Sequence, residues 1–302
     1  MRGQLIAHRD DETLYSVMAR LARYLAIGET GNLHRSLFGR DVPVLDGMAT
    51  NLTLVVGSGV FGEIEIADVA LEWTTLPYHV RYAHPARREA VIDKMRRGGA
   101  VAATSLGVAA HHLEEGVLKF CPACIEEMSE LHADPWWRRS HQLPAVRACP
   151  DHGDPLRLST VTSAMRRNGY HAASSHTCPP NSEEIEVGSA GSATRRDHLQ
   201  IARSADRLLD ARDELHPDDV RESYLSRLQT AGLLNRLGEA DVGKIAGAMD
   251  RYWGDTLRSW QQLHENGRCS QRWLGRLLLG EHRSPALHHL LLQGLLEALD
   301  GN

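Results

Sequence analysis

The amino-acid sequence predicts a mainly α-helical protein, and three observations support this prediction. Hydrophobic residues make up 42% of the 302 residues, but aromatic residues only 5%. A core built from Leu, Ala and Val favours packed helices over a β-sandwich. Cysteine, proline, tryptophan and histidine concentrate between residues 119 and 158, where helical periodicity stops. We therefore predict an N-terminal helical domain (1–118), a cysteine-rich segment with loops (119–195) and a C-terminal helical domain (196–302).

The N-terminal domain is expected to begin with two helices. Asp10 or Asp11 can cap the first, and Gly28 and Gly31 are expected to end it. Its apolar residues recur at helical spacing: Leu14, Met18, Leu21 and Leu25. Asn32 can cap a short second helix. A helix, a glycine turn and a helix are compatible with a helix-turn-helix, although the pattern favours a simple αα-hairpin.

The rest of the chain also alternates helices with loops. Residues 41–63 are expected to form a loop or an isolated strand pair, and residues 159–195 to form loops. A basic helix is predicted over Ala86–Arg97, ending at Gly98 and Gly99. Three helices are predicted in the C-terminal domain: Asp218–Gln229, Asp241–Trp260, and one that begins at a Ser284 cap with Pro285 in its first turn.

The charge balance and the apolar runs limit where this protein can act. The formal net charge is −5, whereas proteins that bind DNA chiefly by neutralising phosphates usually carry a basic stripe or a high pI. We therefore expect any DNA contact to be local or shared with partners. No apolar run is long enough to span a membrane, and the N-terminus reaches acidic residues too soon for a signal peptide. A cytoplasmic location follows, in which the five cysteines are metal ligands or buried thiols rather than disulfides.

Two short cysteine-containing pairs carry the strongest chemical signal. Cys121-Pro-Ala-Cys124 is followed, after residues 125–148, by Cys149-Pro-Asp-His152. Two intervening residues let each pair form a tight knuckle, and Zn²⁺ prefers four tetrahedral nitrogen and sulfur ligands. A complete Cys₃His set has no open position for water, so the pattern predicts a structural Zn²⁺ in a central zinc ribbon.

Other histidines compete for a place at this site. His132 and His141 lie between the two pairs, but the spacing favours His152 as the fourth ligand. We expect His141 to pack or to hydrogen-bond beside the ribbon. A second metal is conceivable at three further residues if one more ligand joins them: His171, His176 and Cys178.

Parts of the same pattern also occur in enzymes. His112-Leu113-Glu114 before the first cysteine pair resembles a zinc deaminase, but Phe120 stands where the deaminases have proline, and the histidine is only nine positions from Cys121. A thioredoxin-like C-x-x-C would need a βαβ pattern, which is missing. The sequence contains neither a G-x-x-x-x-G-K-[ST] phosphate loop nor a G-x-S-x-G elbow. We predict that the protein is not an enzyme, with a zinc-dependent enzyme as the alternative.

Taken together, these motifs resemble the TniQ family, which includes TnsD-like target selectors. The resemblance is carried by the two cysteine pairs, with Phe120 before the first and Gly153 after the second, and by the run Trp137-Arg138-Arg139-Ser140-His141-Gln142-Leu143-Pro144. Weaker matches follow the family's order elsewhere: Asp11-Glu12-Thr13-Leu14-Tyr15-Ser16, Thr75-Leu76-Pro77-Tyr78-His79, Trp273-Leu274 and His288-His289-Leu290-Leu291-Leu292. Many relatives carry a second C-x-x-C finger, whereas residues 159–195 offer only Cys178.

This resemblance implies a non-catalytic adaptor in bacterial DNA transposition. Such adaptors recognise a target site, or an RNA-guided Cascade complex bound to it, and recruit a AAA+ ATPase that calls in the transposase. The resemblance also implies a homodimer. Residues 119–167 carry seven basic and six acidic side chains, and this near-neutral balance favours a protein-contact surface. The alternative within binding proteins is an autonomous, sequence-specific DNA-binding protein that uses its own helix-turn-helix.

Overall fold

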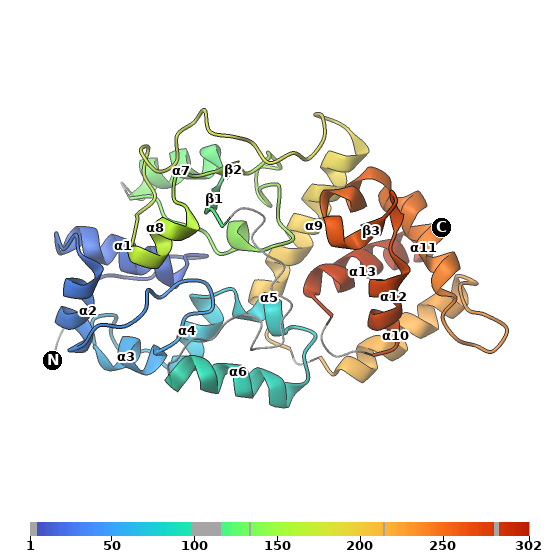
Figure 1. Cartoon of the computed structure of the whole chain (residues 1–302), viewed down its shortest axis with the longest axis horizontal. Coiled ribbons are helices and arrows are strands. Elements are labelled where there is room, and N and C mark those ends of the chain that lie inside the picture. The colour runs from blue at the N-terminus through green and yellow to red at the C-terminus, as the bar shows by residue number, and fades with distance from the viewer. Residues whose placement is uncertain (1–4, 98–115, 133, 214, 281–283, 302) are drawn as a thin grey trace.

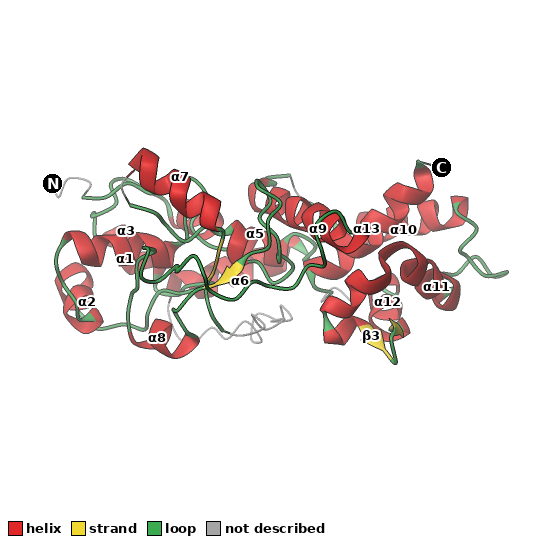
Figure 2. Ribbon diagram, turned by 90° about the horizontal axis from the view of Figure 1, so that it is seen from above, coloured by secondary structure: helices red, strands yellow, loops and turns green. Residues whose placement is uncertain are grey.

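The computed structural model describes residues 5–97, 116–132, 134–213, 215–280 and 284–301, and it is mainly helical, as predicted. The molecule is elongated, with the first helices towards one end and α10–α12 towards the other (Figures 1 and 2). The N-terminal helices are α1 (Leu14–Tyr24), α2 (Thr30–Phe38), α3 (Leu52–Gly57), α4 (Ile66–Glu72), α5 (Leu76–Val80) and α6 (Pro85–Arg97).

The middle of the chain combines two very short strands with helices. Its elements are β1 (Lys119–Phe120), α7 (Pro122–His132), the 3-10 turn η1 (Ser140–Gln142), β2 (Arg157–Leu158) and α8 (Ser163–Asn168). The C-terminal part contains α9 (Ala193–Asp210), α10 (Pro217–Thr230), α11 (Val242–Trp253), the 3-10 turns η2 (Gly254–Ser259) and η3 (Gln261–Leu263), the hairpin β3 (His264–Glu265) and β4 (Arg268–Cys269), α12 (Gln271–Leu278) and α13 (Ala286–Asp300). In the parts of the chain described here, no helix is both long and apolar enough to cross a membrane.

The first two helices begin and end at residues other than those predicted. The Oγ1 atom of Thr13, rather than Asp10 or Asp11, caps α1 by accepting the backbone N–H of Ser16 at 3.1 Å. This helix ends well before Gly28, because Ala26 adopts a left-handed φ of 54°. The helix α2 already begins at Thr30, so both Gly31 and Asn32 lie inside it.

Other expected boundaries also need correction. Residues 41–63 contain α3 and no strand pair, because Leu52 and Val55 turn one helical face into the core. Asp241 does cap α11, but the helix ends at Trp253, where Gly254 takes a positive φ of 48°. Pro285 occupies the N-cap position of α13 in place of Ser284. The expected Gly98–Gly99 stop and the His112-Leu113-Glu114 motif lie outside the described residues.

Three buried clusters hold the fold together, and the cysteine-rich segment contributes to two of them. One N-terminal cluster joins α1–α6, from Leu14 to Met95. The largest cluster joins the helices α9, α10, α11, α12 and α13. It also includes Cys121, Cys124 and Cys149. A small third cluster packs the segment against α1: Tyr15, Leu118, Phe120, Trp137, Val161, Ala173 and Cys178. The cysteine-rich segment therefore lies at the junction of the two helical regions.

The short strands form a sheet whose edges are closed by side chains and loops. Strands β1 and β2 are antiparallel, with Lys119 opposite Leu158, and residues 183–185 add backbone hydrogen bonds on the far side of β2. On the edge of β1 that faces away from β2, the Gln142 side-chain amide accepts the N–H of Lys119 at 3.0 Å and donates to its carbonyl at 2.9 Å. A side chain thus satisfies a strand edge that would otherwise need a partner.

Gly294 allows α13 to pack closely on α11, and its replacement by alanine is expected to destabilise the protein. A Cβ atom at this position would lie 2.5 Å from Cζ2 of Trp253, whose indole is held by a 2.9 Å hydrogen bond from Nε1 to the Leu291 carbonyl. We expect Gly294→Ala to lower the free energy of unfolding by about 1–3 kcal/mol in urea titrations, although alanine is the better helix former. Gly275→Ala in α12 is the matched control, because nothing lies within 4 Å of its added Cβ; it should stabilise the protein by about 0.5–1 kcal/mol.

Candidate metal centre

Both predicted knuckles meet in space, and they bring four side chains to one point. The Nδ1 atom of His152 lies 3.6 Å from the sulfur of Cys121, 3.4 Å from that of Cys124 and 3.5 Å from that of Cys149. The Cys124 and Cys149 sulfurs are 3.6 Å apart, and all four ligand atoms lie within 4.8 Å of one another. For bonds of about 2.3 Å to sulfur and about 2.0 Å to nitrogen, a tetrahedral zinc site has edges of about 3.8 Å between sulfurs and about 3.5 Å between sulfur and nitrogen. These four residues are therefore suited to holding one metal ion.

Local backbone structure explains how each knuckle forms. Strand β1 ends directly before Cys121, and α7 begins at Pro122, so Cys124 lies in its first turn, where the N–H of Ile125 donates to the Cys121 carbonyl at 3.1 Å. The second knuckle is a tight turn in which the N–H of Gly153 donates to the Cys149 carbonyl at 2.9 Å. Gly153 takes a φ of 72°, which glycine adopts without steric cost.

The fourth side chain is oriented by a carboxylate that the sequence reasoning did not identify. The Nε2 atom of His152 lies 3.0 Å from Oε1 of Glu127, one turn after Cys124 on α7. This contact favours the tautomer that keeps Nδ1 free to face the sulfurs, as a partner behind a metal-binding histidine usually does. The side chain of His152 is 23% exposed, whereas the three cysteines are buried.

The thiols also influence one another in the absence of an ion. Hydrogen bonding from Cys124, and then from Cys149, lowers the pKa of Cys121 to about 3, so this thiol loses its proton first. Hydrogen bonding with Cys121, and then with Cys149, raises the pKa of Cys124. Thiols bind a metal ion as thiolates, so metal binding at this site releases protons.

His141 lies beside the cluster, as expected. Its Nε2 atom is 3.9 Å from the Cys124 sulfur, it is 2% exposed, and burial lowers its pKa, so the ring is neutral. His132 instead contacts the ring of Trp136. The proposed second set, His171, His176 and Cys178, is not brought together: within the described ranges, the Cys121–His152 set is the one group of three or more candidate ligands. Cys178 is buried in the small third cluster, and this burial raises the pKa of its thiol to about 12.

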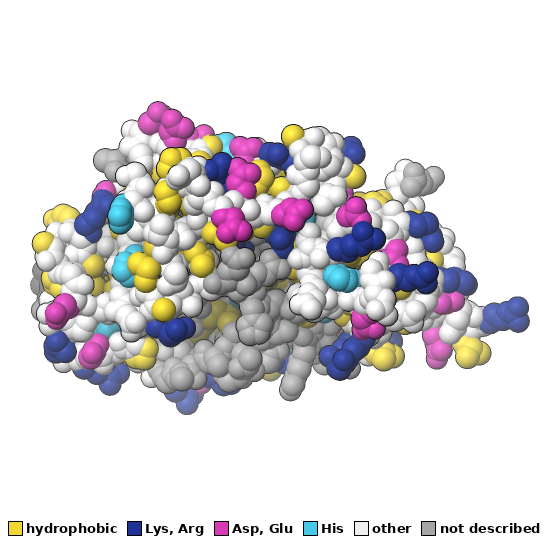
Figure 3. Space-filling view, turned by 45° about the horizontal axis from the view of Figure 1, so that its top comes forward, with side chains coloured by type: hydrophobic (Ala, Val, Ile, Leu, Met, Phe, Trp, Pro, Cys, Tyr) yellow, Lys and Arg dark blue, Asp and Glu magenta, His cyan; other side chains and the backbone are white. Residues whose placement is uncertain are grey.

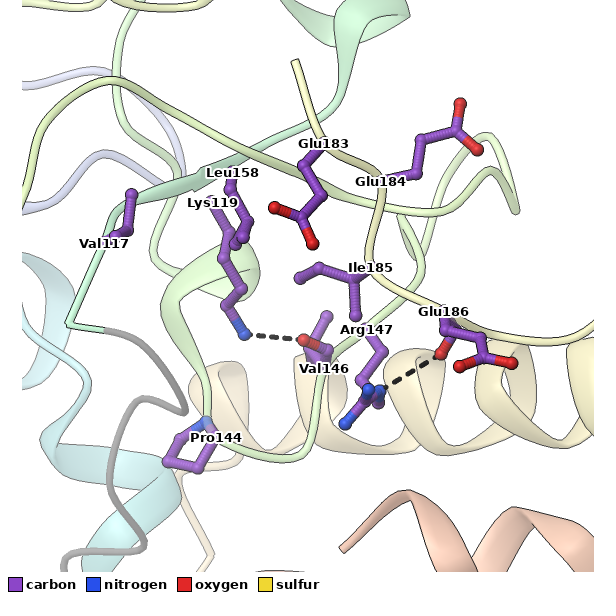
Figure 4. A pocket seen from close by; sticks show the side chains of 10 residues that line it. All are labelled: Val117, Lys119, Pro144, Val146, Arg147, Leu158, Glu183, Glu184, Ile185 and Glu186. Atoms are coloured by element: carbon purple, nitrogen blue, oxygen red, sulfur yellow. Dashed lines mark hydrogen bonds between the residues drawn. The ribbon is translucent and has the colours of Figure 1, made fainter.

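A cavity of about 230 Å³ lies beside β1 and β2, between residues 183–186 and the loop at Pro144 (Figure 4). Its two cations hold neighbouring backbone. Nζ of Lys119 donates to the carbonyls of Leu143 and Val146 at 2.7 and 2.6 Å, and Arg147 donates to the carbonyls of Glu186 and Ser259 at 3.3 and 2.9 Å. With neither cysteine nor histidine in its lining, this cavity is separate from the candidate metal centre.

With this geometry established, comparison with known proteins identifies the family. The sequence model of the TniQ family matches residues 6–156, which is half of the chain. The chain belongs to the TniQ family. The TniQ match begins before α1 and ends directly after the second knuckle, so it includes the whole candidate metal centre. A curated relative is the transposon Tn7 transposition protein TnsD of Escherichia coli, which is 28% identical over 148 residues. That alignment covers 47% of this chain and 29% of the relative, so the matched part spans less than a third of the length of TnsD.

Asp206, which lies on α9 near this centre, should make the stability of the protein depend on pH. Burial, followed by the nearby carboxylate of Asp11, raises the pKa of Asp206 from 3.8 to about 6. Because the pKa of Asp206 is higher in the folded protein than in the unfolded chain, its charged form destabilises the fold above pH 6. This penalty disappears as the pH falls towards the pKa that Asp206 has in the unfolded chain. We expect Asp206→Asn to stabilise the protein by about 1–3 kcal/mol at pH 7.5.

The gain from Asp206→Asn should shrink steadily between pH 6 and pH 4, which urea titrations of the variant and parent at matched pH would measure. Asp154→Asn, at an exposed pair with Arg195 in the same region, is the control and should change stability by less than about 1 kcal/mol. A gain for Asp206→Asn that is the same at every pH would contradict the prediction.

Proposed function

We propose that this chain is a non-catalytic target-selection adaptor in DNA transposition. Membership of the TniQ family carries the proposal, because the matched region contains both the N-terminal helices and the cysteine–histidine cluster. The relation to a transposition protein supports the same process. In this proposal, the adaptor links recognition of a target site, through DNA or an RNA-guided Cascade complex, to a AAA+ ATPase and its transposase.

We further propose that Cys121, Cys124, Cys149 and His152 hold a structural Zn²⁺. Three cysteines and a histidine are a common structural set, and four protein ligands leave no position for a reactive water. The ion would supply binding free energy to a segment whose strands are only two residues long. This assignment favours a rigid scaffold over a zinc enzyme.

The position of the cysteine-rich segment supports the role of a scaffold. It packs on α1 through the small third cluster and on α9 through the largest one, so it holds two helical regions in one orientation. Acidic and basic side chains are interspersed on the face shown in Figure 3. Such a surface is better matched to protein partners than to the phosphate backbone of DNA.

Co-purification and DNA binding would test this proposal together. The tagged full-length chain should retain the AAA+ ATPase of its own transposon, and a Cascade complex if the transposon encodes one, and size-exclusion chromatography should show a homodimer. Its affinity for target DNA alone should be weak and should fall only gently with salt. Nanomolar, sequence-specific binding with a steep salt dependence and no retention of the ATPase would favour autonomous DNA recognition instead.

A further inference from the structure

One cation contacts the candidate metal centre and the N-terminal segment at the same time. Nη1 of Arg138 lies 3.2 Å from the sulfur of Cys124, and Nε donates to Oδ2 of Asp11 at 2.8 Å. The same Nη1 also donates to Asp151, which precedes His152. The side chain of Arg138 is only 17% exposed, so these contacts are made largely away from water.

Asp11 in turn fixes the run that carries Arg138. Its Oδ1 accepts the N–H of Ser140 at 3.0 Å, its Oδ2 accepts the hydroxyl of Ser140 at 2.5 Å, and its carbonyl accepts the N–H of Arg139 at 2.7 Å. Asp11 can do this because it adopts a left-handed φ of 54°, which aspartate tolerates better than most residues. Because its carboxylate is bound to Ser140, Asp11 does not cap α1.

Further hydrogen bonds extend the contact along both segments. The N–H of Thr13 donates to the carbonyl of Trp137 at 3.0 Å, and the N–H of Trp137 donates to Oγ of Ser16 at 3.0 Å. Nε1 of Trp136 donates to the Asp10 carbonyl at 3.1 Å. Residues 10–16, which we call the docking segment, are therefore held on residues 136–140 by a continuous set of hydrogen bonds.

Charge connects this contact to metal binding. In the loaded centre proposed above, the sulfur of Cys124 would be a metal-bound thiolate, and Nη1 of Arg138 lies 3.2 Å from that sulfur. A largely buried guanidinium interacts more strongly with an anionic sulfur than with a neutral one. Arg138 consequently supports a ligand of the loaded centre through this hydrogen bond, and its position for that contact is set by Asp11.

We propose that Arg138 is a positioning residue of the metal centre that couples metal occupancy to the docking segment. This inference rests on the metal binding proposed above. Because coupling between two sites is reciprocal, metal binding strengthens docking, and docking strengthens metal binding by the same free energy. A purely structural Arg138 would hold Asp11 without any influence on the metal–sulfur bonds.

Cobalt-substituted full-length protein would test this coupling. The parent and four variants are compared: Arg138→Gln, Arg138→Lys, Asp11→Asn and, as a control, Glu184→Gln, whose partner Arg157 contacts none of the four candidate ligands. Removing a hydrogen bond from a thiolate raises the energy of its lone pairs, so Arg138→Gln should shift the sulfur-to-cobalt charge-transfer band to longer wavelength. It should also lower the affinity for cobalt by about 10–100-fold in competition with a chelator, as is typical of residues that support metal ligands, and speed metal release to that chelator. The lysine variant should recover part of this loss.

Asp11→Asn provides the decisive comparison, because Asp11 does not touch a ligand. We expect this variant to release metal several times faster than the parent. In the parent, hydrogen exchange at residues 10–16 should be slower with metal than without it, and this difference should shrink in Asp11→Asn. If Asp11→Asn and Arg138→Gln bind cobalt with the parent's spectrum and release rate, the coupling is refuted while the metal centre stands. A Glu184→Gln variant with the same changes would also refute it. If the parent binds no metal, the proposed metal centre itself fails; should Arg138→Gln not fold, the Asp11→Asn comparison decides.

Discussion

Cys124→Ser is expected to abolish metal binding and to unfold the cysteine-rich segment. Cys124 contributes a buried sulfur to the four-atom cluster, and serine lacks the thiolate that Zn²⁺ prefers. Structural zinc contributes about 10–16 kcal/mol to the folding of small zinc domains. This segment also packs on two helical regions, so we expect a smaller loss, but still more than about 4 kcal/mol. Elemental analysis should find one zinc per parent chain and none in the variant, with lost hydrogen-exchange protection between residues 117 and 187.

Cys269→Ser is the matched control for this prediction. Cys269 is also a buried cysteine, at 6% exposure, but it lies on β4 and outside the candidate metal centre. The control should retain one zinc and should lose only the modest stability that follows from placing a hydroxyl among apolar neighbours. A folded, zinc-free parent, or a Cys124→Ser variant with unchanged zinc content, would contradict the assignment of these residues as ligands.

Glu12→Ala should cost about 3–5 kcal/mol, because it leaves a buried arginine without its counter-ion. Glu12 is fully buried and accepts two hydrogen bonds from Arg20, Nε to Oε1 at 2.8 Å and Nη2 to Oε2 at 2.7 Å. Urea titration would measure the loss. Replacing both partners, as Glu12→Leu with Arg20→Met, should recover most of it, because a well-packed apolar pair can replace a buried ion pair.

An exposed ion pair supplies the comparison for Glu12. Asp93 and Arg97 form a pair on α6 with side-chain exposures of 42% and 74%, and Asp93→Ala should cost less than about 1 kcal/mol. Similar losses for Glu12→Ala and Asp93→Ala would show that burial of the Glu12–Arg20 pair carries little free energy. If the double replacement were as unstable as Glu12→Ala, the loss would come from packing and not from the unpaired charge.

Much of the candidate metal centre could be predicted because its signal is local. Each knuckle consists of two ligand types separated by two residues, and a tight turn is the conformation that brings such neighbours together. The preference for His152 over His141 also followed from spacing, and the structure places His152 among the three sulfurs and His141 beside them. Glu127 could have been suspected, since it follows Cys124 by three residues, which is nearly one helical turn. The helix α7 that positions it was not expected, because its periodic signal is short.

The supporting residues were beyond sequence reasoning because their partners are distant in the chain. Arg138 is 127 residues from Asp11, and nothing in either motif indicates that they meet. The same holds for the cap of α1: Asp11 is a strong capping residue by propensity, but its carboxylate is committed to Ser140, and Thr13 caps instead. Helices α3, α4 and α5 are too short for periodicity to mark them, and their burial against neighbouring helices determines them.

The amino-acid sequence by itself therefore determined the helical class, the four candidate ligands and the family resemblance. These depend on composition and on residues close together in the chain. Only the tertiary structure showed that residues 10–16 are hydrogen-bonded to residues 136–140 and that Arg138 reaches the sulfur of a candidate ligand. It also showed that the cysteine-rich segment belongs to two hydrophobic clusters. The physical reason is that hydrogen bonds and packing between distant segments depend on where the folded chain places them, which local spacing does not encode.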